Sequence, residues 1–232
     1  PEVSFVYQTE PRGTGHAALV AVESLAAQNY SGNVMIVMGD KATRPQVVEE
    51  LLERFAVTQP DALLSVEEKS ETSTAGRVVQ DDDGTVRGIV EVPDIRQARE
   101  RGTTLEVAGM KLSAAEVEAC SPTVNVSMYL FRFGALHEAL RRLSPNNAQG
   151  ELYLTDTAAC IAKTGKVDLL ALTDPTELMA FNTPAELLAI EEVIRRDEGV
   201  PIVAEDPDAI LDRGTYKPAQ EWLAELEAFA PP

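Results

Sequence analysis

Residues Gln8–Ala17 read QTEPRGTGHA, a glycine-rich stretch that lies between two segments of different character. The apolar run Val3–Tyr7 before it predicts a strand, and the alanine-rich segment from about Ala17 to Ala27 after it predicts a helix. In an open α/β sheet, loops that join a strand to a helix lie beyond the carboxyl ends of the strands, where ligands bind. Gly13 and Gly15 let the backbone approach a ligand closely. The stretch therefore predicts a ligand-binding loop of an α/β domain.

A second apolar run, Val34–Met38, is unbroken and is typical of a strand buried on both faces of a parallel sheet. It ends abruptly at Gly39 and Asp40. Packing explains a carboxylate at the carboxyl end of a buried strand poorly, so we interpret Asp40 as a functional residue. The alternative is an aspartate that caps a helix or stabilises a turn.

The following segments alternate between apolar runs and amphipathic stretches. Pro45 opens a helix with Val48, Leu52 and Phe55 on its inner face. The turn at 81–84, DDDG, predicts a hairpin between its flanking strands. Further strands are predicted at residues 62–66, 77–80, 85–90, 124–133 and 167–172, and helices at 136–143 and through Cys160.

Residues 93–121 are charged and irregular, which indicates a peripheral insertion. A helix is predicted near residues 95–101 and a short hairpin at 105–112. Strands that alternate with helices predict an α/β fold, with a mostly parallel, twisted sheet covered by helices on both faces. The hairpin and the insertion form a small subdomain of this fold.

Near residue 183 the sequence carries a strong helix-start signal. Thr183 at the N-cap, Pro184 after it and Glu186 form a capping box, and the helix runs to about Arg196. Asn182 lies just outside this helix start, where backbone N–H groups favour an anion. From Gly199 the chain is acidic, with a last helix predicted from Pro218. We therefore divide the chain into a domain at 1–198 and a tail at 199–232.

The charge balance excludes several classes of partner. The 232 residues include 38 acidic and 20 basic side chains, a formal net charge of -18. Nucleic-acid binding needs a basic footprint, so neither nucleic acid nor an anionic membrane is an expected partner. No apolar run reaches the roughly 18 residues of a membrane-spanning helix. Cys120 and Cys160 have no metal-ligand spacing, which favours free thiols and a cytoplasmic location.

Two stretches carry the most specific signal: QTEPRGTGHA and, at Asn146–Asp156, NNAQGELYLTD. Together with the polar residues between and after them, they resemble the uridyltransferase domain of the bacterial N-acetylglucosamine-1-phosphate uridyltransferases. These are sugar-nucleotide pyrophosphorylases of the nucleotidyltransferase fold, which is Rossmann-like. The resemblance covers roughly residues 5–195.

The resemblance implies a role for each matching position. Nucleotide binding falls to Gln8, whose amide would hydrogen-bond uracil, and to Gly13, Thr14 and Gly39. The catalytic pair, Asp40 and Asn182, would hold Mg²⁺. The sugar-phosphate pocket would be lined by Gly76, Glu91, Asn125, Tyr153 and Thr155, with Glu91 and Asn125 on the sugar hydroxyls and the N-acetyl group.

Each of these residues also has a plain structural interpretation when it is taken alone. Gln8 is of a kind common at exposed strand ends, and Glu91 would serve equally as a strand-end charge. Tyr153 is as well suited to a core as to a ligand pocket. Asn182 would be simply the residue before a well-capped helix. The ordered set is far more specific than any member, and His16 is assigned no chemistry.

The implied reaction transfers a uridylyl group from UTP to a sugar 1-phosphate, with N-acetylglucosamine 1-phosphate as the expected acceptor. It yields a UDP-sugar and pyrophosphate. Such chemistry needs alignment and charge neutralisation rather than a protein nucleophile. Mg²⁺ suits it, because this ion keeps few protein ligands. The alternatives are a non-catalytic nucleotide-sugar binding or regulatory module, or a nucleotidyltransferase for another sugar or another base, such as thymine, which presents a similar edge. Assembly into a homo-oligomer stays open.

The chain departs from the family pattern at several places. The family opens with a strand and a glycine-rich loop that carries an arginine and then a lysine, and we expect this segment upstream of Pro1 or from elsewhere. After Asp40, Lys41 and Arg44 would either touch phosphates or be solvated. Ser127 stands where the family favours glycine, and the insertion could alter sugar selectivity. The chain has no acetyltransferase repeats, so we expect a single activity.

Overall fold

The computed structural model describes residues 4–174 and 176–197. Its contacts divide the chain into two units. The first comprises Pro1–Gly39 and Thr43–Leu178, and the second comprises Asp40–Ala42 and Met179–Pro232. The predicted boundary after residue 198 stays a prediction, and the helix expected from Pro218 lies outside the described residues.

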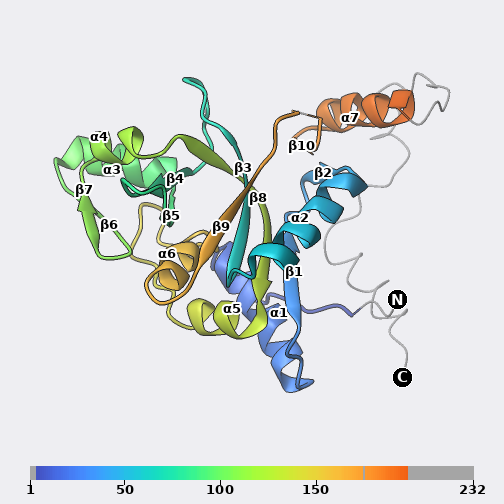
Figure 1. The fold of residues 1–232 in the computed structure, drawn as a ribbon, viewed down its shortest axis with the longest axis horizontal. Coiled ribbons are helices and arrows are strands. Elements are labelled where there is room, and N and C mark those ends of the chain that lie inside the picture. The colour runs from blue at the N-terminus through green and yellow to red at the C-terminus, as the bar shows by residue number, and fades with distance from the viewer. Residues whose placement is uncertain (1–3, 175, 198–232) are drawn as a thin grey trace. The chain divides into compact units, whose positions relative to one another are not determined.

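The first unit is built on a six-stranded sheet of order β5-β4-β8-β3-β9, in which β1 also pairs with β8. The longest strand, β8, therefore has three partners and lies in the middle of the sheet (Figure 1). The strands are β1 (Asn33–Val37), β3 (Ala62–Glu68), β4 (Arg77–Gln80), β5 (Val86–Val90), β8 (Thr123–Arg132) and β9 (Val167–Ala171).

The strand directions make this a mixed sheet. β9 runs parallel to β3, whereas β8 runs antiparallel to β1, β3 and β4. It follows that β1, β3, β4 and β9 share one direction, and that β5 and β8 oppose them. The predicted α/β fold is confirmed, with most strands pointing one way. Because β8 is reversed, its first residues lie at the sheet edge where β1 and β3 end.

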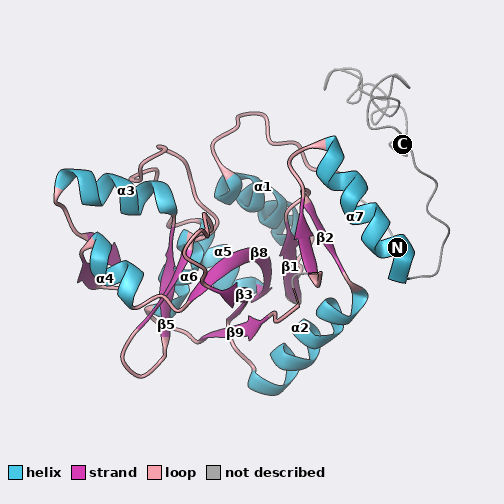
Figure 2. Ribbon diagram, turned by 90° about the horizontal axis from the view of Figure 1, so that it is seen from above, coloured by secondary structure: helices cyan, strands magenta, loops and turns pink. Residues whose placement is uncertain are grey.

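Helices cover both faces of the sheet, as predicted, and Figure 2 shows α1 and α2 on opposite sides. On one face α1, α5 and α6 pack on Leu64 and Phe131. On the other face α2 packs on Leu63 and Leu130, the neighbours of those residues in their strands. Successive strand residues point to opposite faces, so each strand contributes to both cores. These helices are α1 (Thr14–Ala27), α2 (Pro45–Thr58), α5 (Phe133–Leu140) and α6 (Asp156–Ala162).

The predicted insertion forms a small core of its own beside β4 and β5 (Figure 1). The predicted helix and hairpin are present, and a second helix follows them. That helix begins with a capping box, in which Glu116 N–H donates to Ser113 Oγ (3.3 Å) and Ser113 N–H to Glu116 Oε2 (2.7 Å). The elements are α3 (Val92–Arg101), β6 (Leu105–Val107), β7 (Met110–Leu112) and α4 (Ala114–Ala119).

Three local predictions are wrong. The described part of Val3–Tyr7, residues 4–7, forms no strand, and its apolar side chains are exposed. β1 is buried on one face only, since Met35 and Val37 are 38% and 39% exposed. α2 buries Val47, Leu51 and Phe55, whereas the predicted Leu52 is exposed. Each of these segments is apolar, as the predictions assumed. The first two are not covered by other parts of the chain as expected, and α2 turns a different set of residues toward the core.

The second unit contains α7 (Pro184–Asp197), and the predicted capping box at the start of this helix is confirmed. Glu186 N–H donates to Thr183 Oγ1 (3.2 Å), and Thr183 N–H donates to Glu186 Oε2 (3.0 Å). Ahead of this helix, β10 (Leu178–Ala180) pairs with β2 (Lys41–Thr43). None of the helices within residues 4–174 and 176–197 is long and apolar enough to cross a membrane.

Candidate functional site

The two motifs that carry the family resemblance bind to each other. Gly15 N–H donates to the carbonyl of Leu152 (2.7 Å), and Leu152 N–H donates to the carbonyl of Arg12 (2.8 Å). Leu154 N–H donates to Thr14 Oγ1 (3.2 Å). These bonds are mostly between backbone groups. They join the loop before α1 to the segment before α6 into one wall of the candidate site.

Glycine is required where these two segments meet. Gly13 has φ 103°, and a Cβ there would lie 2.6 Å from the carbonyl oxygen of Leu152. A Cβ on Gly15 would lie 2.5 Å from Leu143 Cδ1 and 2.8 Å from the same carbonyl. Backbone atoms cannot move aside as a flexible side chain can. The glycines of QTEPRGTGHA therefore allow docking of the second motif, besides any approach to a ligand. Gly39 differs, because a Cβ there meets nothing within 4 Å.

The Gln8 side chain is held by its own loop. Its Nε2 donates to the carbonyl of Gly13 (3.1 Å) and lies 2.9 Å from His16 Nδ1. His16 Nδ1 also lies 3.1 Å from the carbonyl of Glu10. His16, to which the sequence assigned no role, thus orients Gln8. In the sequence His16 stands near the start of a predicted helix, and nothing in that position indicates a contact with Gln8.

Four of the five predicted sugar-pocket residues contact one another. Asn125 N–H donates to the carbonyl of Gly76 (2.9 Å), and Thr155 Oγ1 donates to Glu91 Oε1 (2.8 Å). A Cβ on Gly76 would lie 3.0 Å from Glu91 Oε2. The sheet brings them together, because β4 begins, β5 ends and β8 begins at one place, with Arg77 opposite Val90.

A β-bulge in β8 shapes the Asn125 end of this pocket. The pairing of β3 with β8 slips between Leu64 and Val66, and Ser127 takes a left-handed conformation with φ 65°. This turn lets Asn125 Nδ2 donate to the Tyr129 hydroxyl (2.8 Å), and Ser127 N–H donate to Asn125 Oδ1 (3.1 Å). The left-handed region favours glycine, which accounts for the glycine of the family pattern at Ser127.

Two further carboxyl groups, those of Asp94 and Asp156, lie close to Glu91 of the predicted sugar pocket. Burial raises the pKa of Asp156 to about 7, with further contributions from Asp94 and Glu91. Burial also raises the pKa of Glu91, opposed by the hydrogen bond from Thr155, and that of Asp94, opposed by the Ala148 N–H. Glu91, Asp94 and Asp156 border a cavity of about 420 Å³ between α6 and the inserted segment. Asp94 and Asp156 were absent from the predicted site, although Asp156 closes the NNAQGELYLTD motif.

Tyr153 is almost fully buried, at 5% exposed. Its hydroxyl donates to Gln149 Oε1 (2.8 Å), and burial raises its pKa to about 12. The side chain therefore supports the NNAQG loop, and its contact with a ligand stays a prediction.

Asp40 and Asn182 belong to the second unit, where the backbone brings them together. Phe181 N–H donates to the carbonyl of Asp40 (3.0 Å), which places Asn182 one residue from that pairing. Within the described residues Asp40 Oδ1 is buried and has no hydrogen-bond partner. Arg44, rather than Asp40, occupies the N-cap of α2, so the helix-cap alternative for Asp40 is wrong.

An unpaired buried carboxylate oxygen is costly, and a bound cation would relieve that cost. The unpaired oxygen of Asp40 thus suits an Mg²⁺ ion, and Asn182 as its second ligand stays a prediction. No group of three or more His, Cys, Asp or Glu side chains in the described parts of the chain could hold a metal. A site here would have few protein ligands, as Mg²⁺ prefers. Asn182 itself is exposed, and its N–H donates to Glu186 Oε2 (2.7 Å).

Arg44 is half-buried and bonded to a nearby loop. Its Nε donates to the carbonyl of Thr176 (3.1 Å), and one terminal nitrogen donates to Thr176 Oγ1 (2.9 Å). Full solvation of Arg44 is therefore wrong. Phosphate contacts by Arg44 or Lys41 stay a prediction.

Comparison with known proteins points in one direction. The family model described as Nucleotidyl transferase matches residues 1–176. The chain is 34% identical over 157 residues to the "Bifunctional protein GlmU" of Gloeobacter violaceus, covering 67% of this chain and 30% of that protein. It is 32% identical over 164 residues to the protein of the same name from Mycolicibacterium gilvum, covering 70% and 29%. The chain spans about a third of the length of the curated relatives it matches.

Solved structures agree on the fold. Apo UDP-glucose pyrophosphorylase superposes with a TM-score of 0.59 at 16% identity, over 84% of this chain and 64% of that one. A UDP-glucose pyrophosphorylase complexed with UDP-glucose gives 0.53 at 18% identity, over 73% and 58%. At such identities the likeness shows the fold alone.

Proposed function

The chain belongs to the nucleotidyl transferase family, and we propose on that premise that it transfers a uridylyl group from UTP to a sugar 1-phosphate. N-acetylglucosamine 1-phosphate is the proposed acceptor, and the products are the UDP-sugar and pyrophosphate. The observation that carries the proposal is the mutual contact of Gly76, Glu91, Asn125 and Thr155. These four residues come from separate elements.

The proposed acceptor site follows from the chemistry of those groups. Glu91 and Asn125 offer a carboxylate, an amide donor and an amide acceptor, which suit sugar hydroxyls and an N-acetyl group. Glu91 Oε1 already accepts a hydrogen bond from Thr155, so its direction is fixed before a ligand arrives. The bulge at Ser127 fixes Asn125 in the same way.

The proposed nucleotide site is the loop before α1. With Gln8 Nε2 bonded to Gly13 and near His16, the Gln8 amide plane is fixed, as recognition of a base edge requires. Uracil and thymine present the same hydrogen-bonding edge, so the choice of UTP rests on the resemblance to the uridyltransferases.

Catalysis in this proposal is alignment. A phosphate oxygen of the sugar 1-phosphate attacks the α-phosphorus of UTP, the bond from that phosphorus to the β-phosphate bridging oxygen breaks, and pyrophosphate leaves with the electron pair. Mg²⁺, when bound, would neutralise charge on the phosphates. Asp40 and Asn182 would hold it, and the other site residues orient the two substrates.

Pyrophosphate release from UTP, Mg²⁺ and N-acetylglucosamine 1-phosphate tests the proposal with the full-length protein. Asp40→Ala should remove most activity, whereas Asp83→Ala, in an exposed turn, should leave it intact. Replacing the acceptor by glucose 1-phosphate, and UTP by dTTP, tests the two specificities. Absence of turnover with every pair would overturn the transferase proposal. Binding of UDP-sugar without turnover would favour the alternative, a nucleotide-sugar binding module.

A further inference from the structure

We propose that Glu118 of the inserted segment is a positioning residue for the sugar-phosphate pocket, because its carboxylate joins the two ends of the loop that contains Gly76. This loop, residues 69–77, is called the Gly76 loop below. The inference rests on the proposed function, in which Gly76 borders the acceptor. It gives the insertion a defined task.

Arg77, at one end of the Gly76 loop, is the central cation of this arrangement. Its side chain is nearly buried, and its residue is only 7% exposed. Its Nε donates to Glu118 Oε2 (2.9 Å), and one terminal nitrogen donates to the carbonyl of Ala75 (2.7 Å). Arg77 therefore holds the residue before Gly76 on one side and the inserted segment on the other.

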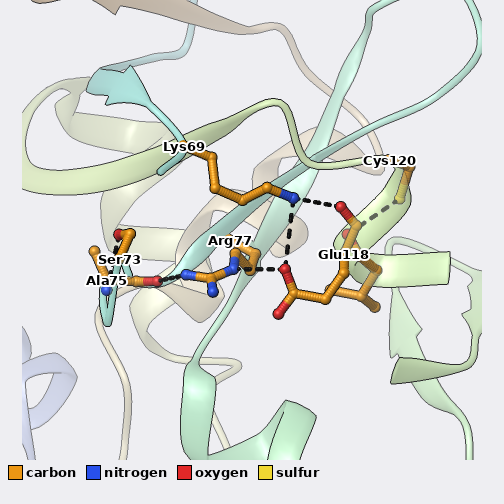
Figure 3. Close-up of polar contacts among 7 residues, drawn as sticks. Lys69, Ser73, Ala75, Arg77, Glu118 and Cys120 are labelled. Carbon is orange, nitrogen blue, oxygen red and sulfur yellow. Dashed lines mark hydrogen bonds and ion pairs between the residues drawn. The ribbon is translucent and has the colours of Figure 1, made fainter. Parts of the chain in front are cut away.

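Lys69, at the other end of the Gly76 loop, reaches the same carboxylate. Its Nζ lies 3.5 Å from Glu118 Oε2 and also donates to the Glu118 carbonyl. Its backbone N–H donates to the carbonyl of Pro122 (3.0 Å). Figure 3 shows Lys69 and Arg77 converging on Glu118 from the two ends of the loop.

Between these ends the Gly76 loop has few bonds of its own. Ser73 N–H donates to the carbonyl of Ser70 (3.3 Å), and Ala75 N–H donates to Ser73 Oγ (3.4 Å). Most of residues 70–74 is exposed. The ends therefore decide where the loop lies. Backbone hydrogen bonds hold both ends, and the side chains of Lys69 and Arg77 at these ends both bond to Glu118.

Gly76 is closely surrounded by neighbouring atoms, so it can shift little without moving them. Its carbonyl accepts the Asn125 N–H (2.9 Å), and a Cβ there would lie 2.9 Å from Ile89 Cγ2 and 3.0 Å from Glu91 Oε2. A shift of Gly76 therefore moves Asn125 or Glu91, the two residues proposed to contact the sugar.

The charge of Glu118 matters because Arg77 is buried. Partial burial acts to raise the pKa of Glu118, but the hydrogen bond and charge of Arg77, followed by Lys69, hold that pKa below its ordinary value. Removal of one partner from a buried ion pair leaves an uncompensated charge, which must find solvent. Because Arg77 also holds the Ala75 carbonyl, a shift of its side chain away from the altered residue 118 would pull on the Gly76 loop.

The test compares Glu118→Gln, which keeps the shape of the side chain but removes its charge, with Glu100→Gln, which makes the same change on the exposed face of α3. We expect Glu118→Gln to raise the KM for the sugar 1-phosphate about tenfold, with the KM for UTP changed by less than about twofold. Glu118→Asp should restore part of the loss. Glu100→Gln should change neither constant.

Hydrogen exchange on the ligand-free protein supplies a readout that needs no turnover. Glu118→Gln should lower protection of the Asn125 amide, which bonds to Gly76, and Glu100→Gln should not. Should Glu118→Gln fail to fold, Lys69→Gln removes one of the two cations and should give a smaller change of the same kind.

The outcomes separate the two proposals. Wild-type protein that turns over substrate, with an unchanged sugar KM in Glu118→Gln, overturns the positioning role. A parallel rise in both KM values overturns it too, since that marks general destabilisation. Loss of Asn125 protection in a protein that never turns over overturns the transferase proposal and leaves the link between Glu118 and Gly76 supported.

Discussion

Two loops border the candidate site in the first unit, and they are held by different means. The loop at residues 8–17 is fixed mainly by backbone hydrogen bonds to the segment before α6, at positions where only glycine fits. The Gly76 loop is fixed by two cations that converge on a carboxylate about forty positions later in the chain. The glycines that allow the first arrangement can be recognised in the loop's own sequence. The second depends on a partner that sequence pattern does not identify.

Gly13→Ala should displace the loop at residues 8–17, and we expect it to have the largest effect on stability among these variants. The added Cβ would meet the Leu152 carbonyl oxygen at 2.6 Å, in a backbone conformation unfavourable for alanine. We expect a loss of about 3–4 kcal/mol in the free energy of unfolding, measured by urea denaturation, and loss of activity. Gly134→Ala is the control, because a Cβ there meets nothing within 4 Å. Equal stability of the two variants would contradict the steric account.

Arg77→Met should break the second loop with a smaller effect. It removes the buried cation and leaves Glu118 with Lys69, so we expect a loss of about 2–3 kcal/mol in the free energy of unfolding. Arg87→Met removes the ion pair of a more exposed arginine with Asp81 and should cost less than Arg77→Met does. A smaller loss for Arg77→Met than for Arg87→Met would show that the Gly76 loop is not held by its ion pairs.

The segment that docks on the first loop ends in Asp156, which makes that contact sensitive to pH. The folded-state pKa is about 7, mainly through burial, and the ordinary value is 3.8. Above 3.8 the unfolded chain loses this proton more readily than the folded one. Stability should therefore fall as pH rises from about 4 to about 7 and then level off.

Asp156→Asn should reduce this dependence, leaving the part due to Glu91 and Asp94, whose pKa values burial also raises. We expect a gain of roughly 2 kcal/mol over wild type at pH 8, shrinking towards pH 4. Urea denaturation across this range checks it. Asp83→Asn, in the exposed turn between β4 and β5, should show the wild-type slope. A wild-type slope in Asp156→Asn would mean that another group titrates.

Ser127→Gly should have the smallest effect on stability among these variants. The bulge in β8 has the conformation that favours glycine, like Gly13, yet carries a serine. Glycine there should raise the free energy of unfolding by about 1 kcal/mol. Asn29→Gly is the control, because asparagine tolerates its φ of 59° and less should be gained. A loss of stability in Ser127→Gly, seen by thermal unfolding, would contradict the strain at this bulge.

The same contrast explains how far the sequence could be read. The helix after the loop at 8–17, the hairpin turn at 81–84 and the capping box at Thr183 are local patterns, and the structure contains each of them. The sugar-pocket set was found as an ordered series, and four of its five members do meet. Local patterns could not predict which residues distant in sequence contact one another.

Three failures share that cause. The run at Val3–Tyr7 has the composition of a strand, but a strand also needs a neighbour. The direction of β8 depends on pairings with β1, β3 and β4, and only those pairings place Asn125 at the edge where β1 ends. Glu118 had no signal, since an exposed helix carries many such carboxylates.

The inserted segment leaves the sheet and returns to it on either side of one residue. Val90, at the end of β5, and Val124, at the start of β8, both pair with Arg77. Two strand spacings separate these points, about 10 Å, which three or four extended residues can bridge. A replacement segment between Glu91 and Thr123 therefore needs only to bridge this gap and to cover Val79 and Val90, which the inserted segment buries. Its length could vary without changing the strand pairings on either side.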